Sequence, residues 1–483
     1  MDRDLKGSLG IMVRSPAQSL ASLLAQKRVG VPAKASTTQQ ETRGSQETRG
    51  SWVNLLLTYW GTWGTHALAL ADQAVVSGAS FLTTVVIGRW TFPSQLGVYS
   101  IGISLLISSL VIQESLILVP YTIQRHRLLG AQAERAGSSL AQSGLLSALG
   151  IVVLVVTALG LSARDAEPTL VAMTWALAAV LPFTLLREFG RRFAFAHLQI
   201  AHALILDSAV AAMQLAGLGL LAWTGRMSAA AACGVLGAAC ALSGVVWLYL
   251  ARADFAIHAD HVRATMKQSW GLGKWLFVSQ INSLVKGYIT YWLLGWIAGA
   301  SATGVYAACM SVVLFANPFI QGLGNIFGPK AALVFKEGGG ARLRREVARE
   351  SLLLGVAMTL FCSVVLFAGE HVMRFLYPGN EYEGNGHTVT VLALALLASA
   401  VGMPASNALE SIERPREVFW AGLFAAVLTA ALVWSLVAGW GLLGAAYGFL
   451  AGNVAGAAGL WVAFLASVQR HGPEAHPQTH QTR

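Results

Sequence analysis

The sequence contains few charged side chains. Only 12% of its 483 residues are Asp, Glu, Lys or Arg, whereas apolar residues make up 55%. A soluble domain carries roughly 25% charged residues, so this chain has too few to cover the surface of a water-soluble globule of its length. The composition therefore argues against an ordinary soluble protein and predicts one that lies within a membrane.

Cysteine is also scarce, and the known catalytic sequence motifs are missing. The four cysteines include no C-x-x-C pair, and Cys233 and Cys240 lie seven residues apart in one apolar run. On a helix that spacing is about 10 Å along the axis, too far for a disulfide. No Walker loop, nucleophile elbow or zincin motif occurs in a fitting context. We therefore predict no metal site, no cofactor and no enzyme activity. The first 50 residues also lack the features of a signal peptide, so the first apolar helix is expected to direct insertion.

Long apolar runs recur along the chain at lengths that suit membrane-spanning helices. A helix needs about 20 apolar residues to cross a bilayer, and the runs do not alternate as barrel strands do. The expected spans are 67–87, 95–118, 140–161, 169–186, 200–222, 228–250, 275–297, 303–327, 351–369, 388–409, 418–438 and 441–467. The predicted fold class is thus an all-α polytopic membrane protein with twelve transmembrane helices in two six-helix bundles. Two like-oriented bundles would be related by a pseudo-two-fold axis along the membrane normal.

The distribution of basic residues predicts the orientation. With the N-terminus in the cytoplasm, 28 of the 33 Lys and Arg residues fall in cytoplasmic segments and only four fall outside. Cytoplasmic loops carry such an excess, so both termini are expected in the cytoplasm of a cytoplasmic (inner) membrane protein. The net charge of +10 is explained by this topology, and no nucleic-acid partner is needed to account for it.

The chain divides into five predicted segments by composition. A polar, basic stretch at the start suggests a disordered cytoplasmic tail, and the aromatic-rich residues 52–66 suggest an interfacial lead-in to the first helix. The predicted segments are a tail at 1–51, an N-terminal bundle with its lead-in at 52–250, a cytoplasmic linker at 251–274, a C-terminal bundle at 275–467 and a second cytoplasmic tail at 468–483.

A short pattern occurs twice, 207 residues apart. Residues 73–104 and 280–311 share eight identities in 32 positions, including Gly97-Val98-Tyr99 and Gly304-Val305-Tyr306. Each copy predicts a helix, a short loop and a second helix. Repeated halves in a membrane protein are typical of transporters whose substrate site lies between the halves.

Four charged side chains fall within the expected spans: Asp72, Glu114, Asp207 and Lys286. Such groups are costly in lipid and should face a bundle interior or a wet cavity. We interpret Lys286, near the midplane, as a contact for an anionic substrate. The three acids are candidates for proton or cation coupling. The substrate-binding set is completed by hydrogen-bonding side chains nearby, Gln73, Gln280 and Asn282. The alternative is that these groups pair across helices and have no part in transport.

Five stretches carry a resemblance to a known family. They are Ile87-Gly88-Arg89 through Tyr99, Leu294-Gly295 through Tyr306, Phe375-Leu376-Tyr377-Pro378-Gly379-Asn380-Glu381-Tyr382, Ile412-Glu413-Arg414-Pro415-Arg416 and Gly441-Leu442-Leu443-Gly444-Ala445-Ala446. In this order they resemble the polysaccharide (O-antigen type) flippases of the multidrug/oligosaccharidyl-lipid/polysaccharide exporter superfamily. The match extends over nearly all of residues 66–467.

The resemblance implies a transporter that flips a polyprenyl-diphosphate-linked oligosaccharide, a lipopolysaccharide or exopolysaccharide precursor, across the membrane by alternating access. Its expected partners are the lipid-linked glycan, membrane lipids and the polysaccharide polymerase and glycosyltransferase machinery. An ion-coupled multidrug or small-molecule antiporter of the same superfamily remains an alternative. A membrane enzyme is disfavoured because the outer loops are short, and an inactive scaffold stays open.

Overall fold

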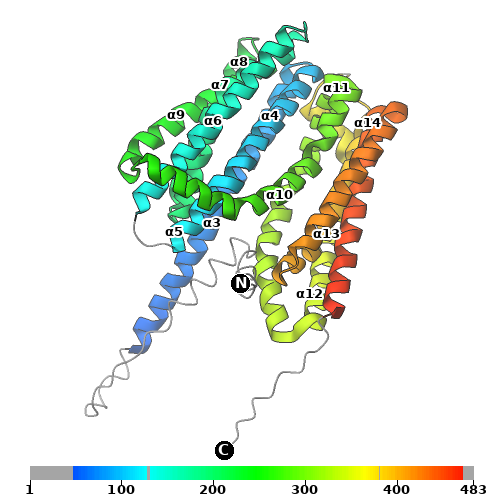
Figure 1. Cartoon of the computed structure of the whole chain (residues 1–483). Helices are drawn as coiled ribbons and strands as arrows, with labels where there is room; N and C mark the ends of the chain where they lie inside the picture. The colour runs from blue at the N-terminus through cyan, green and yellow to red at the C-terminus, as the bar shows by residue number, and fades with distance from the viewer. Residues whose placement is uncertain (1–46, 128–130, 380, 471–483) are drawn as a thin grey trace, which may run out of the picture.

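The structure, a computed structural model, describes residues 47–127, 131–379 and 381–470, and every regular element in these ranges is a helix. The first half contains α3 (Glu47–Trp90), α4 (Pro93–Gln113), the π-helix η2 (Glu114–Leu118), α5 (Val119–Arg127), α6 (Gln132–Ser162), α7 (Pro168–Ala196), α8 (Ile200–Trp223), α9 (Ala229–Ala251) and η3 (Arg252–Asp254). The second half contains α10 (Ala259–Ile297), α11 (Gly299–Val313), η4 (Leu314–Ala316), α12 (Asn317–Leu376), α13 (Gly386–Ser411) and α14 (Pro415–Arg470). The two halves form two lobes (Figure 1).

Two of the long helices reverse direction at a glycine. Gly339 in α12 has φ 62° and Gly441 in α14 has φ 54°, a backbone region that glycine adopts without steric cost. Figure 1 shows the chain turning back at both places, so α12 and α14 are each a pair of antiparallel arms.

The helix count agrees with the sequence prediction. In the described residues, nine helical stretches are long and apolar enough to cross a membrane. Two of these stretches contain the reversals at Gly339 and Gly441, and α10, which carries Lys286, is a further long helix outside that set. Separating the antiparallel arms and including α10 gives the twelve predicted crossings. The all-helical, two-lobed membrane fold is therefore confirmed.

The two lobes meet closely where the repeated pattern lies. A Cβ added to Gly97 of α4 would lie 1.8 Å from the backbone oxygen of Ala300, and one added to Gly304 of α11 would lie 1.8 Å from that of Pro93. Only glycine permits so close an approach of two backbones. The duplicated glycines thus hold one lobe against the other, and the Trp292 indole Nε1 of α10 donates to Ser104 Oγ of α4 at 2.7 Å nearby.

Several helix boundaries differ from the sequence expectation. Helix α3 begins at Glu47, so the last residues of the predicted tail are helical, while 1–46 lie outside the described residues. Most of the predicted linker 251–274 belongs to η3 and to the first turns of α10. Helix α7 continues to Ala196, ten residues beyond the apolar run that predicted it. In each case polar residues extend a helix past its apolar part, which hydrophobicity alone does not detect.

Candidate functional site

Lys286 lies on a polar stripe of α10. Ser279, Ser283 and Gly287 are exposed, whereas Gln280 and Lys286 are partly buried. Residues three and four apart share one face of a helix, so these side chains follow one side of α10. The helix contacts α4, α6 and η2 of the first lobe and α11 and α14 of the second, which places the stripe where the lobes adjoin.

Lys286 has no acidic partner among the residues that the structure describes, since none of the ion pairs found there includes it. A partly buried ammonium group without a carboxylate carries its charge uncompensated. Such a group is suited to attract an anion.

The three predicted hydrogen-bonding residues differ in whether their amides are bound to another helix. Asn282 donates from Nδ2 to the Phe419 backbone oxygen of α14 at 3.1 Å, so its amide joins α10 to α14. Gln73 is exposed on α3, where Nε2 donates to Ser77 Oγ at 3.2 Å within the same helix. Gln280 is partly buried on the stripe of Lys286. Asn282 is closer to Lys286 along the chain, but its amide is bound to α14. Gln280 is therefore the better candidate for a substrate contact beside Lys286.

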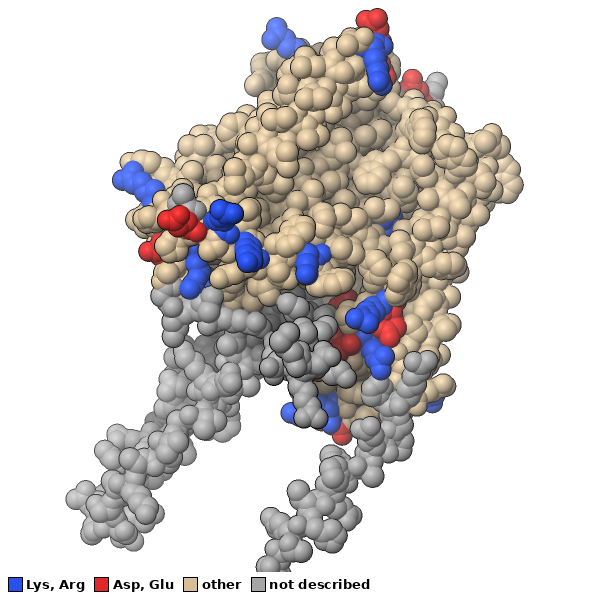
Figure 2. Space-filling view, in the orientation of Figure 1, with Lys and Arg blue, Asp and Glu red and all other residues tan. Residues whose placement is uncertain are grey.

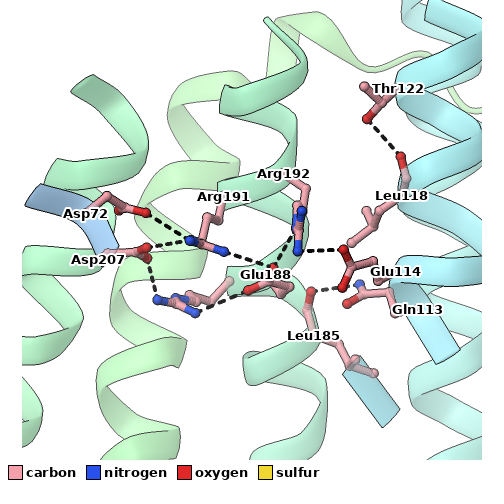
Figure 3. Close-up of polar contacts among 11 residues, drawn as sticks. Asp72, Gln113, Glu114, Leu118, Thr122, Leu185, Glu188, Arg191, Arg192 and Asp207 are labelled. Carbon is pink, nitrogen blue, oxygen red and sulfur yellow. Dashed lines mark hydrogen bonds and ion pairs between the residues drawn. The ribbon is translucent and has the colours of Figure 1, made fainter. Parts of the chain in front are cut away.

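The three predicted acids meet a cluster of arginines on α7. Arg191 Nη2 lies 2.9 Å from Asp72 Oδ2 of α3, and its Nε lies 2.7 Å from Asp207 Oδ2 of α8. Arg187 also pairs with Asp207. Figure 3 shows both aspartates directed at α7. The carboxylates of Asp72 and Asp207 are almost fully buried, at 2% and 0% side-chain exposure, so their charges depend on these arginines.

The cluster continues toward η2 (Figure 3). Arg192 Nη2 lies 2.7 Å from Glu114 Oε1, and its Nε lies 3.0 Å from Glu188 Oε1. Glu188 also contacts Arg187 at 3.3 Å and Arg191 at 3.5 Å. We call this set the α7 network; its members are Asp72, Glu114, Arg187, Glu188, Arg191, Arg192 and Asp207. It joins α3, η2, α7 and α8 at one end of the first lobe.

Sequence reasoning did not identify α7 as the partner of the acids. The three arginines follow the predicted span 169–186, so the apolar pattern places them outside the membrane. A signal was present, because Arg187, Glu188, Arg191 and Arg192 are spaced one, three and one apart. On a helix this spacing places them together along one side, within reach of acids on neighbouring helices.

A polar layer beside the α7 network is also buried. Gln113 Nε2 donates to Ser143 Oγ of α6 at 3.0 Å and to the Leu185 backbone oxygen of α7 at 2.9 Å. Gln214 of α8 donates to Thr83 Oγ1 of α3 at 2.8 Å. These bonds fix the helices that carry the charged residues. Within the described part of the chain, no group of three or more His, Cys, Asp and Glu side chains could hold a metal ion.

The end of α12 packs on the end of α3. Tyr377, which follows α12, lies over Gly88, where a Cβ would be 2.5 Å from its ring. The Tyr377 hydroxyl and Ser311 Oγ of α11 are 2.6 Å apart, and Arg89 Nη1 donates to the Phe375 backbone oxygen at 3.1 Å. This contact and the Gly97–Gly304 contact both join the two lobes near the helix ends at Trp90 and Pro93.

Solved transporters share this arrangement. No protein-family model matches the sequence, and no curated protein matches it. An inward-facing structure of a multidrug resistance MATE family transporter of the MOP superfamily aligns with a TM-score of 0.69 and 13% identity, covering 84% of this chain and 100% of the other. An outward-facing structure of a multidrug resistance MATE family transporter of the MOP superfamily aligns at 0.61, with 13% identity, 84% of this chain and 96% of the other.

A third match, at TM-score 0.60 and 13% identity over 84% of this chain and 96% of the other, is a MOP superfamily transporter from Pyrococcus furiosus. It is described as having a binding pocket of reverse polarity that suggests a different function. The chain has the fold of these transporters. The three structures named above are described as MOP superfamily transporters, and the assignment of this chain to the polysaccharide flippases stays a prediction.

Proposed function

We propose that this protein transports an anionic amphiphile across the cytoplasmic membrane by alternating access. The substrate class is a polyprenyl-diphosphate-linked oligosaccharide moved from the inner to the outer leaflet. The transporter fold supports transport, and the sequence motifs support the glycan. In this proposal both termini lie in the cytoplasm, as the basic residues predict.

The evidence for an anionic substrate is the contrast between the acidic and the basic side chains predicted within the membrane. The three acids predicted within the spans, Asp72, Glu114 and Asp207, are all held by arginines of the α7 network. Lys286, in contrast, has no acidic partner in the described chain. Cationic drugs would need free carboxylates, and a diphosphate would need a free cation. A cation in a site of low dielectric attracts phosphate far more strongly than it does in water.

In this mechanism the polar stripe of α10 faces the aqueous space between the lobes. Lys286 binds the diphosphate there, and Gln280 and Gln73 donate hydrogen bonds to the substrate. Asp72, Glu114 and Asp207 would couple transport to an ion gradient only by exchanging a proton or cation within the α7 network.

The test is Lys286→Ala in proteoliposomes that contain a fluorescent polyprenyl-diphosphate-linked disaccharide. We expect flipping to fall at least tenfold, Lys286→Arg to retain part of it, and the exposed Lys336→Ala to leave it unchanged. Unimpaired flipping by the Lys286→Ala protein would remove Lys286 from the mechanism.

An ion-coupled multidrug antiporter is the second candidate, because two of the solved structures named above are multidrug resistance transporters. Efflux of ethidium driven by an ion gradient in the same vesicles would favour it. Ethidium efflux without glycolipid flipping would overturn the first proposal.

A further inference from the structure

The first turns of α10 present a basic stripe on their exposed side. Arg263, Lys267, Trp270 and Lys274 are all exposed, and their spacings of four, three and four residues place them on one side of the helix. At 1.5 Å per residue the stripe is about 16 Å long. Figure 2 shows Lys and Arg side chains along this part of the molecule, with a few acidic side chains beside them and a mostly uncharged described surface around them.

The opposite side of the same turns is fixed against the first lobe. Thr265, Ser269 and Gly273 are buried at successive intervals of four residues. A Cβ on Gly273 would lie 2.6 Å from the Ser115 backbone oxygen of η2, so the helix sits directly on that backbone. Because this seam prevents rotation of α10, the basic stripe is held outward.

The three cations of the stripe make no ion pair with any acid of the described ranges, and Asp260, exposed one turn earlier, is not within ion-pair distance of them. Lys330 of α12, by contrast, pairs with Glu350 at 2.7 Å. The stripe therefore offers its charge to a partner outside the protein.

The neighbouring exposed residues indicate what that partner is. Met266, Trp275 and Val278 are 49%, 67% and 44% exposed, so apolar surface adjoins the cations along α10. Trp side chains favour the boundary between headgroups and hydrocarbon, and Lys and Arg clusters next to a membrane span attract anionic lipid. A membrane surface explains why exposed cations and exposed apolar side chains adjoin along one helix, whereas a protein partner would not require both.

We propose that Arg263, Lys267, Trp270 and Lys274 form a binding surface for the headgroups of anionic phospholipids in the inner leaflet. The cations pair with lipid phosphates, and the Trp270 ring lies among the headgroups. The surface anchors the part of α10 that precedes Lys286. It is independent of what the protein transports.

The test places the photoreactive residue p-benzoylphenylalanine at position 270 of the full chain. The protein is reconstituted in vesicles of equal parts phosphatidylcholine and phosphatidylglycerol, irradiated, and its lipid adducts are identified by mass spectrometry. We expect phosphatidylglycerol adducts to exceed phosphatidylcholine adducts by roughly twofold or more. Equal adducts of both lipids would overturn the proposal.

Charge-matched variants complete the test. Lys267→Gln with Lys274→Gln should abolish the excess of phosphatidylglycerol adducts. Arg164→Gln with Arg226→Gln removes the same charge from exposed positions in the outer segments of the predicted topology and should preserve it. An equal loss in both variants would show a general charge effect and reject the surface. Irradiation in cell membranes that captured mainly a protein at position 270 would reject a lipid partner.

Discussion

Gly97 and Gly304 lie backbone to backbone, and each is the glycine of one copy of the repeated Gly-Val-Tyr pattern. A Cβ on Gly304 would be 3.0 Å from the Gly97 nitrogen and 1.8 Å from the Pro93 oxygen. The repetition found in the sequence is therefore a pair of surfaces that bind each other across the lobes.

Gly97→Ala should destabilise this state. The added methyl group overlaps a backbone atom that cannot move independently, and overpacking of this kind costs about 1–3 kcal/mol. The midpoint of thermal unfolding in detergent should fall. Gly160→Ala is the control, because a Cβ there meets nothing within 4 Å. Equal midpoints for both variants would contradict the close contact.

Arg191→Gln should be the most destabilising change in the α7 network. It leaves two buried aspartates without their shared cation, and breaking a buried pair costs about 3–5 kcal/mol. Arg192→Gln should cost less, because the Arg192 side chain is 35% exposed against 15% for Arg191. Urea unfolding of both variants measures the difference; a larger loss for Arg192→Gln would show that burial does not govern the network.

Asp207→Asn and Glu114→Gln should differ in what they affect. Asp207 accepts from two arginines and is fully buried, so its amide variant should lose stability. Glu114 is 24% exposed and pairs with Arg192 alone among the ion pairs found in the described residues. Its amide variant should fold normally, and a loss of transport in that variant would identify a coupling role. Transport and unfolding measured on the same preparations separate the two effects.

Asn282→Ala and Gln280→Ala test the division of the polar residues on α10. Asn282 holds α14 through the Phe419 oxygen, so truncation should lower stability by about 1 kcal/mol. Gln280→Ala should leave the unfolding midpoint unchanged and slow glycolipid flipping. The reverse pattern, in which Gln280→Ala unfolds more readily and Asn282→Ala flips more slowly, would exchange the roles given to the two side chains.

The fold could be predicted from sequence because lipid imposes a simple rule. A helix that crosses a bilayer needs a run of apolar residues, and all twelve runs lie in helices of the described structure. The reversal at Gly339 falls between two predicted spans, and the reversal at Gly441 falls at the first residue of the last one. What the apolar pattern could not give was the length of helix beyond the hydrocarbon, as the polar end of α7 illustrates.

The site was harder to predict. Hydropathy indicates how deep a side chain lies in the membrane, but not which neighbouring helix it faces. Asp72, Glu114 and Asp207 were recognised as groups that need partners, and the partners are Arg191, Arg192 and Arg187 of α7. Neither the pairing nor the attachment of Asn282 to α14 follows from spacing along the chain, since both depend on which helices become neighbours. Lys286 stands out only after the pairs of the other charges are known.

The π-helix at Glu114–Leu118 has one further consequence. Its first residue holds Arg192, while the Ser115 oxygen next to it supports Gly273 of α10. Five residues thus touch both the arginine cluster of one lobe and the helix that leads to Lys286. A change in how Glu114 is held would therefore also act on the surface on which α10 rests.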